Sequence, residues 1–393
     1  MIVTLKDITT KITKGTTPTS IGCKFEKSGI NFIKSESLVD GKTIDKSKFA
    51  FISERTHERL KRSQIEENDI LFSMAGMFLG KTGIATAEVV PANTNQAVAI
   101  IRVDDTKANY EYVYYYLNQK SVIHTINTTS AQSAQPNINL KQIGKIKINL
   151  PNRKKQDQIV SLLSAIDLKI SNNVEINDNL YAQVKAIFSE NFLNLDFLPD
   201  GWKTGNLLDI ADYLNGLAMQ KYRPKDGETG LPVLKIKELR QGICDANSEL
   251  CSPSIKSEYI IHDGDIIFSW SGSLLVDIWC GGTCGLNQHL FKVTSNNYDK
   301  WFYYLWTAHH LDRFIAVAAD KATTMGHIKR EELEKAEVII PSKCDYKRIS
   351  TLIKPLFDLI ISNRIENRKL TALRNTLLPK IMSGEIDVSD IQL

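Results

Sequence analysis

Two features that direct proteins away from the cytoplasm are missing from this sequence. No apolar run is long enough to span a membrane, and the first residues, MIVTLKDITT, lack the basic-then-apolar pattern of a secretion signal. We therefore expect a cytoplasmic protein without membrane contact, whose six cysteines stay reduced. A large net charge is missing too: the formal charge is +4, which alone does not predict a nucleic-acid ligand.

Motifs of known catalytic sites are also missing. We find no nucleophile elbow, no metalloprotease motif, no Asn-Pro-Pro-Tyr-type methyltransferase motif and no glycine-rich S-adenosylmethionine loop. Residues 75–82, AGMFLGKT, fit a relaxed phosphate-binding loop, but such a loop must open a helix. The following GIATA is typical of a strand, so we predict a hairpin, with Lys81 near DNA phosphate. The chain is not expected to be an enzyme.

A metal site is not expected either. Cys244, Cys251, Cys280 and Cys284 supply four potential zinc ligands, but none of their spacings is that of a common zinc knuckle. The first half of the chain has no counterpart to this group. Free, buried cysteines are therefore the better interpretation.

Two long heptad patterns are present instead, over residues 156–188 and 347–378, about 190 residues apart. The apolar seam positions are Ile159, Leu163, Ile166, Ile170, Leu180, Val184 and Ile187, then Ile349, Ile353, Leu356, Ile360, Leu370 and Leu377. Two slots in the middle of each seam hold asparagine: Asn173 and Asn177, then Asn363 and Asn367. One slot differs between the copies, because Arg374 stands where the first copy has Val184.

These patterns predict two helices that form one intramolecular coiled coil. Asparagine in a seam weakens packing but fixes register, and antiparallel packing would bring the asparagines face to face. At 1.5 Å per residue the coil spans about 50 Å, or about 15 base pairs of DNA. Asn152 and Ser342 are the expected N-caps. Two ordinary core helices are the alternative interpretation.

Three residues are expected to disturb or end the second helix. Pro355 removes a backbone donor near its beginning, so we expect a kink or a delayed start. Pro379 and Gly384 are expected to end regular structure and leave a short tail.

The segments around the helices are duplicated as well. Residues 30–38 match 231–239, 68–76 match 264–272, and Asn95-Gln96 matches Asn287-Gln288. We therefore divide the chain into a domain at 1–150, a helix at 151–197, a second domain at 198–341, and a second helix with its tail at 342–393. Short β-rich segments such as 69–74, 96–103 and 143–150, with aromatic helices at 112–119 and 300–309, predict α+β domains. The duplication predicts that they are related by a pseudo-twofold axis.

Charge is distributed unevenly between the two domains. Residues 1–150 hold 20 basic and 14 acidic residues, whereas residues 198–341 hold 15 and 19. Lysine and arginine bind phosphate or guanine, and glutamine reads adenine, so basic and polar loop residues are candidates for DNA contact. In the first domain they are Lys14, Thr16, Thr17, Lys34, Ser35, Arg55, Arg59, Lys61, Arg62 and Lys81; in the second, Gln220, Lys221, Arg223, Lys225, Lys235, Lys237 and Arg240. The loops at 130–138 and 322–328 are further candidates, and a solvated charged surface is the alternative throughout.

The C-terminal stretch 370–386, LTALRNTLLPKIMSGEI, resembles the signature that closes the specificity subunits of type I restriction-modification systems. LPDGW at 198–202 is similar to the usual beginning of a recognition domain in that family. The duplicated Asp-Ile-Leu/Ile-Phe-Ser and Asn-Gln elements, and Leu150-Pro151 followed by Gln158-Ile159, fit the same family. Arg348 departs from the pattern, since it replaces the expected glutamine before the second seam.

The resemblance implies a division of labour. Each domain would be a target-recognition domain that reads one half of a gapped, bipartite site in double-stranded DNA. The helices would set the gap and dock two modification (methyltransferase) subunits, and restriction subunits (ATP-dependent translocase and nuclease) would complete the complex. This chain would hold no cofactor, with S-adenosylmethionine, ATP and Mg on the partner subunits. The alternatives are a duplicated coiled-coil scaffold or adaptor without DNA specificity, and the recognition half of a fused restriction-methylase with its catalytic half on another chain.

Overall fold

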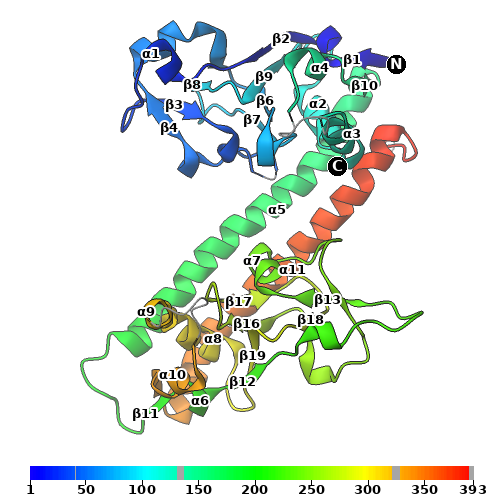
Figure 1. The fold of residues 1–393 in the computed structure, drawn as a ribbon. Helices are drawn as coiled ribbons and strands as arrows, with labels where there is room; N and C mark the ends of the chain where they lie inside the picture. The colour runs from blue at the N-terminus through cyan, green and yellow to red at the C-terminus, as the bar shows by residue number, and fades with distance from the viewer. Residues whose placement is uncertain (40, 131–136, 321–327, 389–393) are drawn as a thin grey trace. The chain divides into compact units, whose positions relative to one another are not determined.

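The computed structural model describes residues 1–39, 41–130, 137–320 and 328–388. The chain forms two compact units, one of residues 1–167 with 373–393 and one of residues 168–372. Two long helices, α5 (Arg153–Phe188) and α11 (Lys343–Ser383), contribute to both units (Figure 1). We call the elements before α5 domain 1 and those between α5 and α11 domain 2. No helix in the described part of the chain is long and apolar enough to cross a membrane.

Domain 1 is built from two four-stranded sheets and one two-stranded ribbon. One sheet has the antiparallel order β2-β9-β6-β7, and the other has the order β4-β3-β8-β5, in which β3 and β8 are parallel. The ribbon pairs β1 with β10, the first strand of the domain with its last. The bounds are β1 Ile2–Thr4, β2 Thr9–Lys14, β3 Ile30–Ile33, β4 Ala50–Ile52, β5 Gln64–Ile65, β6 Ile70–Ser73, β7 Thr82–Ile84, β8 Ala92–Thr94, β9 Val98–Val103 and β10 Lys147–Asn149.

Domain 2 repeats this topology strand for strand. Its sheets have the orders β12-β19-β16-β17 and β14-β13-β18-β15, its ribbon pairs β11 with β20, and β13 is again parallel to β18. The structure therefore confirms the duplication predicted from sequence. The bounds are β11 Lys203–Asn206, β12 Asp212–Asn215, β13 Leu231–Leu234, β14 Leu250–Cys251, β15 Ile260–Ile261, β16 Asp265–Ser269, β17 Leu275–Trp279, β18 Cys284–Leu286, β19 Leu290–Thr294 and β20 Glu337–Ile340.

The repeated Asp-Ile-Leu/Ile-Phe-Ser segments form β6 of the β2-β9-β6-β7 sheet and β16 of the β12-β19-β16-β17 sheet, and both are central strands. In β6, Ile70 and Phe72 enter one hydrophobic core and Leu71 enters another on the opposite face. In β16, Ile266, Phe268 and Ile267 are divided between two cores in the same way. A strand buried on both faces needs a continuous apolar run, which explains why these segments do not alternate with polar residues.

Helices cover the sheets and connect them to α5 and α11. Domain 1 contributes α1 (Glu54–Arg59), α2 (Tyr110–Leu117), α3 (Lys120–Ser130) and α4 (Leu140–Gly144). Domain 2 contributes α6 (Leu207–Ile210), α7 (Ile236–Gln241), α8 (Lys300–His309), α9 (Leu311–Asp320) and α10 (Arg330–Glu334). The aromatic helices predicted at 112–119 and 300–309 are α2 and α8. The strand predicted at 143–150 is wrong in its first half, because Asn139 caps α4 by accepting the Gln142 N–H, and only β10 is a strand.

Both long helices begin at their predicted caps. The Asn152 Oδ1 accepts the Lys155 N–H at 2.9 Å, and the Ser342 Oγ accepts the Asp345 N–H at 3.2 Å. The delayed start expected from Pro355 is wrong, since α11 begins at Lys343. The termination expected at Pro379 is also wrong: α11 continues to Ser383, and Gly384 then adopts a left-handed φ of 83°.

Candidate nucleic-acid interface

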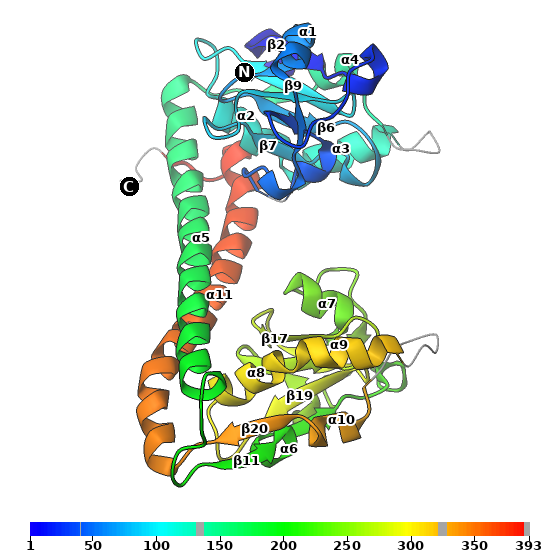
Figure 2. The same ribbon diagram turned by 90° about the vertical axis from the view of Figure 1, so that its left-hand side faces the viewer.

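The seam asparagines face each other in the second unit, where α5 and α11 lie side by side (Figures 1 and 2). The Asn173 side chain donates to the Asn367 Oδ1 at 2.9 Å, and the Asn363 side chain donates to the Asn177 Oδ1 at 2.9 Å. Residue numbers rise on one helix as they fall on the other, so the helices are antiparallel here. Since Asn173 is only 1% exposed, a shift in register would leave buried amides without partners.

The asparagines also bind the backbone of the facing helix. The Asn177 amide donates to the Ile360 carbonyl at 3.3 Å, and the Asn367 amide donates to the Ile170 carbonyl at 3.2 Å. Hydrogen bonds from Asn173 and from Lys169 hold the pKa of Glu366 below its ordinary value. The middle of the seam is therefore a polar network that matches only one alignment of the helices. Its role in fixing register stays a prediction.

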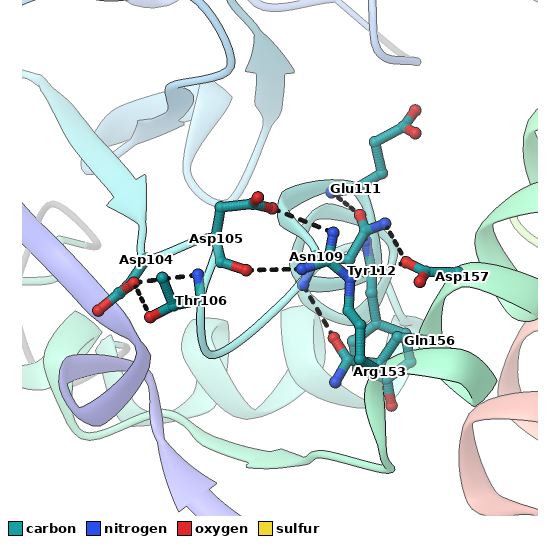
Figure 3. Close-up of polar contacts among 9 residues, drawn as sticks. All are labelled: Asp104, Asp105, Thr106, Asn109, Glu111, Tyr112, Arg153, Gln156 and Asp157. Atoms are coloured by element: carbon teal, nitrogen blue, oxygen red, sulfur yellow. Dashed lines mark hydrogen bonds and ion pairs between the residues drawn. The ribbon is translucent and has the colours of Figure 1, made fainter.

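A second polar network joins domain 1 to the first turn of α5 (Figure 3). The Gln156 Oε1 accepts the Asn109 N–H at 2.9 Å, and its Nε2 donates to the Pro151 carbonyl at 2.9 Å. Asn109 also caps α2, and its Nδ2 donates to the Asp157 Oδ1 at 2.9 Å. Arg153 donates to the same oxygen at 2.9 Å and to the Asp105 carbonyl at 2.6 Å. This network fixes α2 against α5.

The charge of Asp157 is stabilised within this junction. Burial raises the pKa of Asp157, but hydrogen bonds from Asn109 and Arg153 outweigh that effect and leave the pKa below its ordinary value. The neighbouring carboxylate in turn raises the pKa of Arg153. Both groups are therefore charged at neutral pH.

Domain 2 makes the equivalent junction with different residues. Tyr346 occupies the position of Gln156 in the second helix, and its hydroxyl accepts the N–H of Asp299, the N-cap residue of α8, at 2.7 Å. Ser350 donates to the Asp299 Oδ2 at 2.8 Å. Sequence reasoning missed the junction roles of Gln156 and Tyr346, yet each lies three positions before the first assigned seam residue of its helix. Extending the heptad pattern back by one step would have identified them.

Only some of the residues of domain 1 that were predicted to contact DNA lie together. Arg62 donates to the Thr16 Oγ1 at 3.2 Å, and the Thr17 hydroxyl donates to the Gln96 side chain. Gly15 permits this arrangement, because a Cβ there would collide with the Thr94 carbonyl. The structure thus brings Thr16, Thr17 and Arg62 to the repeated Asn-Gln turn after β8.

The structure does not bring the other seven candidates of domain 1 into this group by side-chain contacts among the residues that it describes. Arg59 donates to the Ile21 carbonyl at 3.1 Å. The exposed side chains of Arg55 and Lys61 make no ion pair or hydrogen bond with any residue of the described ranges. The Lys34 ammonium lies 5.4 Å from the ring centre of Phe25 and 3.7 Å from Glu36. In the part of the chain that the structure describes, no side-chain hydrogen bond or ion pair joins Lys14, Lys34 or Ser35 to the group around Arg62. The Lys81 ammonium lies 5.9 Å from the ring centre of Phe78.

Three of the six candidate cations of domain 2 are paired with carboxylates. Arg223 lies 3.1 Å from Glu249, and Lys235 donates to the same carboxylate. Lys235 is the main reason that the pKa of Glu249 is lowered. Lys237 lies 3.7 Å from Asp245. Four candidates are exposed without a side-chain ion pair among the described residues: Gln220, Lys221, Lys225 and Arg240.

Three other predicted features have different outcomes. Residues 75–82 form the β6–β7 hairpin and open no α-helix, so the hairpin is confirmed. Cys251, Cys280 and Cys284 are buried free thiols as predicted, whereas Cys244 is free but only partly buried. Burial raises the pKa of Cys280 to about 11. No cluster of three metal ligands occurs in the described ranges. Most of the candidate loops at 130–138 and 322–328 lies outside the described residues.

Comparisons with known proteins found a matching family model and similar proteins for this chain. The family model described as "Type I restriction modification DNA specificity domain" matches residues 1–182 and 199–373. The type I restriction enzyme MjaIX specificity subunit of Methanocaldococcus jannaschii is 26% identical over 326 residues, covering 77% of this chain and 74% of that protein. The putative MjaX specificity subunit of the same organism is 23% identical, covering 98% of this chain and 93% of that one.

A solved structure shows the same fold. It is the S subunit of a type I restriction-modification system from M. genitalium, with a TM-score of 0.59 and 14% sequence identity. The match covers 97% of this chain and 95% of that one.

Proposed function

The chain belongs to the family of type I restriction modification DNA specificity domains, and on that premise we propose that it is the sequence-recognition subunit of a type I restriction-modification complex. Each domain reads one half of a gapped, bipartite site in duplex DNA. The observation that supports this most directly is the repeated strand topology with unlike surface residues. Two copies of one scaffold that differ in their surface side chains are suited to two unlike half-sites.

The two domains use their cations differently in this proposal. In domain 1, Arg55, Lys61 and Arg62 lie on the surface without a carboxylate partner in the described ranges and bind phosphates. In domain 2, Glu249 holds Arg223 and Lys235 in fixed directions, which suits base contacts better than a flexible cation does. Exposed Lys221, Lys225 and Arg240 supply the phosphate contacts there.

The long helices set the gap and bind the modification subunits in this proposal. Each helix exposes large apolar side chains, including Leu168 (61%) and Val174 (50%) on α5, and Leu352 (49%) and Leu359 (44%) on α11. Exposed apolar residues that gather on one element favour a protein partner. Because the chain contains two copies of the repeat, each copy would dock one modification subunit, which gives two in all.

Chemistry belongs to the partner subunits in this proposal. The modification subunits supply S-adenosylmethionine, and the restriction subunits supply ATP and Mg, while this chain contributes recognition without catalysis. The expected compartment is the cytoplasm, where the host DNA lies.

The test is binding of the purified complex with modification subunits to duplex DNA over a range of salt concentrations. Phosphate contacts predict that affinity falls steeply as salt rises, with a slope that reports the number of contacts. Lys61→Ala and Lys221→Ala should each reduce the slope by about one. A soluble complex that binds no duplex at low salt would contradict the proposal and favour a scaffold.

A further inference from the structure

Arg374 stands at the one seam position where the two helices differ, and it is linked to domain 1 through a carboxylate of α5. The Arg374 Nη1 of α11 donates to the Asp167 Oδ1 of α5 at 2.7 Å, and the Tyr115 hydroxyl of α2 donates to the other oxygen, Oδ2, at 2.6 Å. One carboxylate therefore connects three elements. We call Tyr115, Asp167 and Arg374 the carboxylate junction.

The carboxylate junction is well shielded from solvent. Tyr115 is 2% exposed, and the side chains of Asp167 and Arg374 are 18% and 26% exposed. Burial, together with the Asp167 charge, raises the pKa of Tyr115, so the hydroxyl remains a donor at every physiological pH. Leu378 and Ile381 of α11 enter the same core as Leu163 of α5.

The corresponding seam positions of the other repeat are apolar. Val184 stands at the position of Arg374, and Phe357 stands at the position of Asp167. Both are buried in one core with Tyr304 of α8, whose ring centre lies 5.3 Å from that of Phe357. Apolar contacts tolerate small sliding movements, whereas a carboxylate held at both oxygens has one favourable geometry.

Domain 2 is held to α11 by other charged contacts. Arg364 donates to the Asp277 Oδ1 at 2.7 Å, and both terminal nitrogens of Arg368 donate to the Asp263 carboxylate at 2.7 Å. The equivalent positions of α5 are Val174 and Asp178, which cannot make such contacts. Domain 1 therefore lacks these two anchors and has the carboxylate junction instead.

We propose that Tyr115, Asp167 and Arg374 are positioning residues that fix the orientation of domain 1 on α5 and α11, and thereby the gap length that the complex accepts. The proposal rests on the function proposed above, because the orientation of domain 1 affects which DNA sequences are accepted only if the site has two halves separated by a gap. Breaking the junction should relax the choice of gap without changing the bases read in either half-site.

The test uses the complex with modification subunits and duplexes that carry both half-sites at the natural gap, one base pair shorter and one base pair longer. The readout is the ratio of methylation rates between natural and altered gaps. We expect Arg374→Val, which installs the residue of the other repeat, to reduce this ratio by about tenfold. Tyr115→Phe, which removes a single hydroxyl, should reduce it by about threefold.

Two further variants separate positioning from general stability. Lys380→Ala removes an exposed ion pair with Glu385 at the end of α11, outside both the seam network and the carboxylate junction, and should leave the ratio unchanged. The double exchange Asp167→Arg with Arg374→Asp restores the ion pair and should recover part of the lost discrimination.

Unchanged gap discrimination in a complex that still reads both half-sites, for either Arg374→Val or Tyr115→Phe, would overturn the proposal. If Arg374→Val does not fold, Tyr115→Phe decides the question alone. A wild-type complex that shows no preference for any gap would instead refute the proposed function, so the two failures are distinguishable.

Discussion

Domain 1 and domain 2 share one strand topology but differ in the polar side chains that they place on it. Every strand pairing of domain 1 recurs in domain 2, yet Gln156 and Asn109 at one helix junction are replaced by Tyr346 and Asp299 at the other. Among the described residues, Arg55, Lys61 and Arg62 of domain 1 make no ion pair with a carboxylate, while Arg223 and Lys235 of domain 2 share Glu249. The comparison teaches that the buried apolar pattern specifies the scaffold, whereas the polar helix junctions and the surface cations differ between the copies.

The largest effect is expected from a pair of glycines at equivalent places. Gly15→Ala and Gly216→Ala would each push a Cβ into backbone, at Thr94 in domain 1 and at Asn287 in domain 2. We expect each to destabilise its own domain by about 3 kcal/mol and to abolish only its own half-site. Thermal unfolding and half-site binding measure this. Gly144→Ala, whose Cβ would meet the nearest atom at an ordinary 3.5 Å, is the control, and equal losses for all three would refute the explanation.

The next effect concerns the seam. Asn363→Leu removes the donor to the Oδ1 of the partly buried Asn177 and should cost about 2 kcal/mol in the free energy of unfolding. Adding Asn177→Leu should recover that loss, because two leucines pack well, but the helices should then also pair in other registers. Denaturant unfolding and cross-linking between the helices report stability and register. A double variant that keeps a single register would contradict the role of the asparagines.

A smaller effect would make the surface of domain 2 more like that of domain 1. Glu249→Gln releases Arg223 and Lys235 from their shared carboxylate, so they can bind phosphate instead. We expect tighter non-specific binding, a salt slope larger by about one, and weaker discrimination in one half-site. Glu258→Gln removes the same charge from a residue that pairs with no cation in the described ranges, and should change little. Equal slopes for both variants would argue against the pairing.

The smallest effect is a dependence on acid pH. The pKa of Asp157 is lowered on folding, so its contribution to stability is present above its ordinary pKa of 3.8 and is lost as pH falls through the folded value. Because the side chain is 49% exposed, we expect only a few tenths of a kcal/mol. Asp157→Asn should reduce the loss of stability between pH 4 and pH 2, measured by thermal unfolding. If Asp157→Asn lost as much stability between pH 4 and pH 2 as the wild type, the proposed stabilisation of the Asp157 charge would be contradicted.

The sequence predicts most of the scaffold because burial imposes periodicity. The heptad pattern located α5 and α11 to within a few residues, and the asparagine slots indicated their antiparallel pairing. The errors have local causes. Asn139 caps a short helix where apolar residues had predicted a strand, and Pro379 is tolerated inside α11, which ends four residues later.

The candidate site is less predictable, because charge pairing depends on tertiary contacts. Lys34 and Lys235 stand at equivalent positions in the repeat, but only Lys235 meets Glu249, which lies 14 residues away. Pairing of β13 with β14 brings that carboxylate into reach, and the Val233 N–H donates to the Glu249 carbonyl at 2.7 Å. A list of basic residues does not contain this information.

The most direct test of the central claim is a methylation map. The chain would be co-expressed with its modification subunit, and modified adenines would be located in the host DNA. The account predicts a gapped motif of two unlike halves, of which Arg223→Ala or Lys235→Ala alters one and leaves the other intact. Changes in both halves, or no new methylation despite a soluble complex, would contradict it.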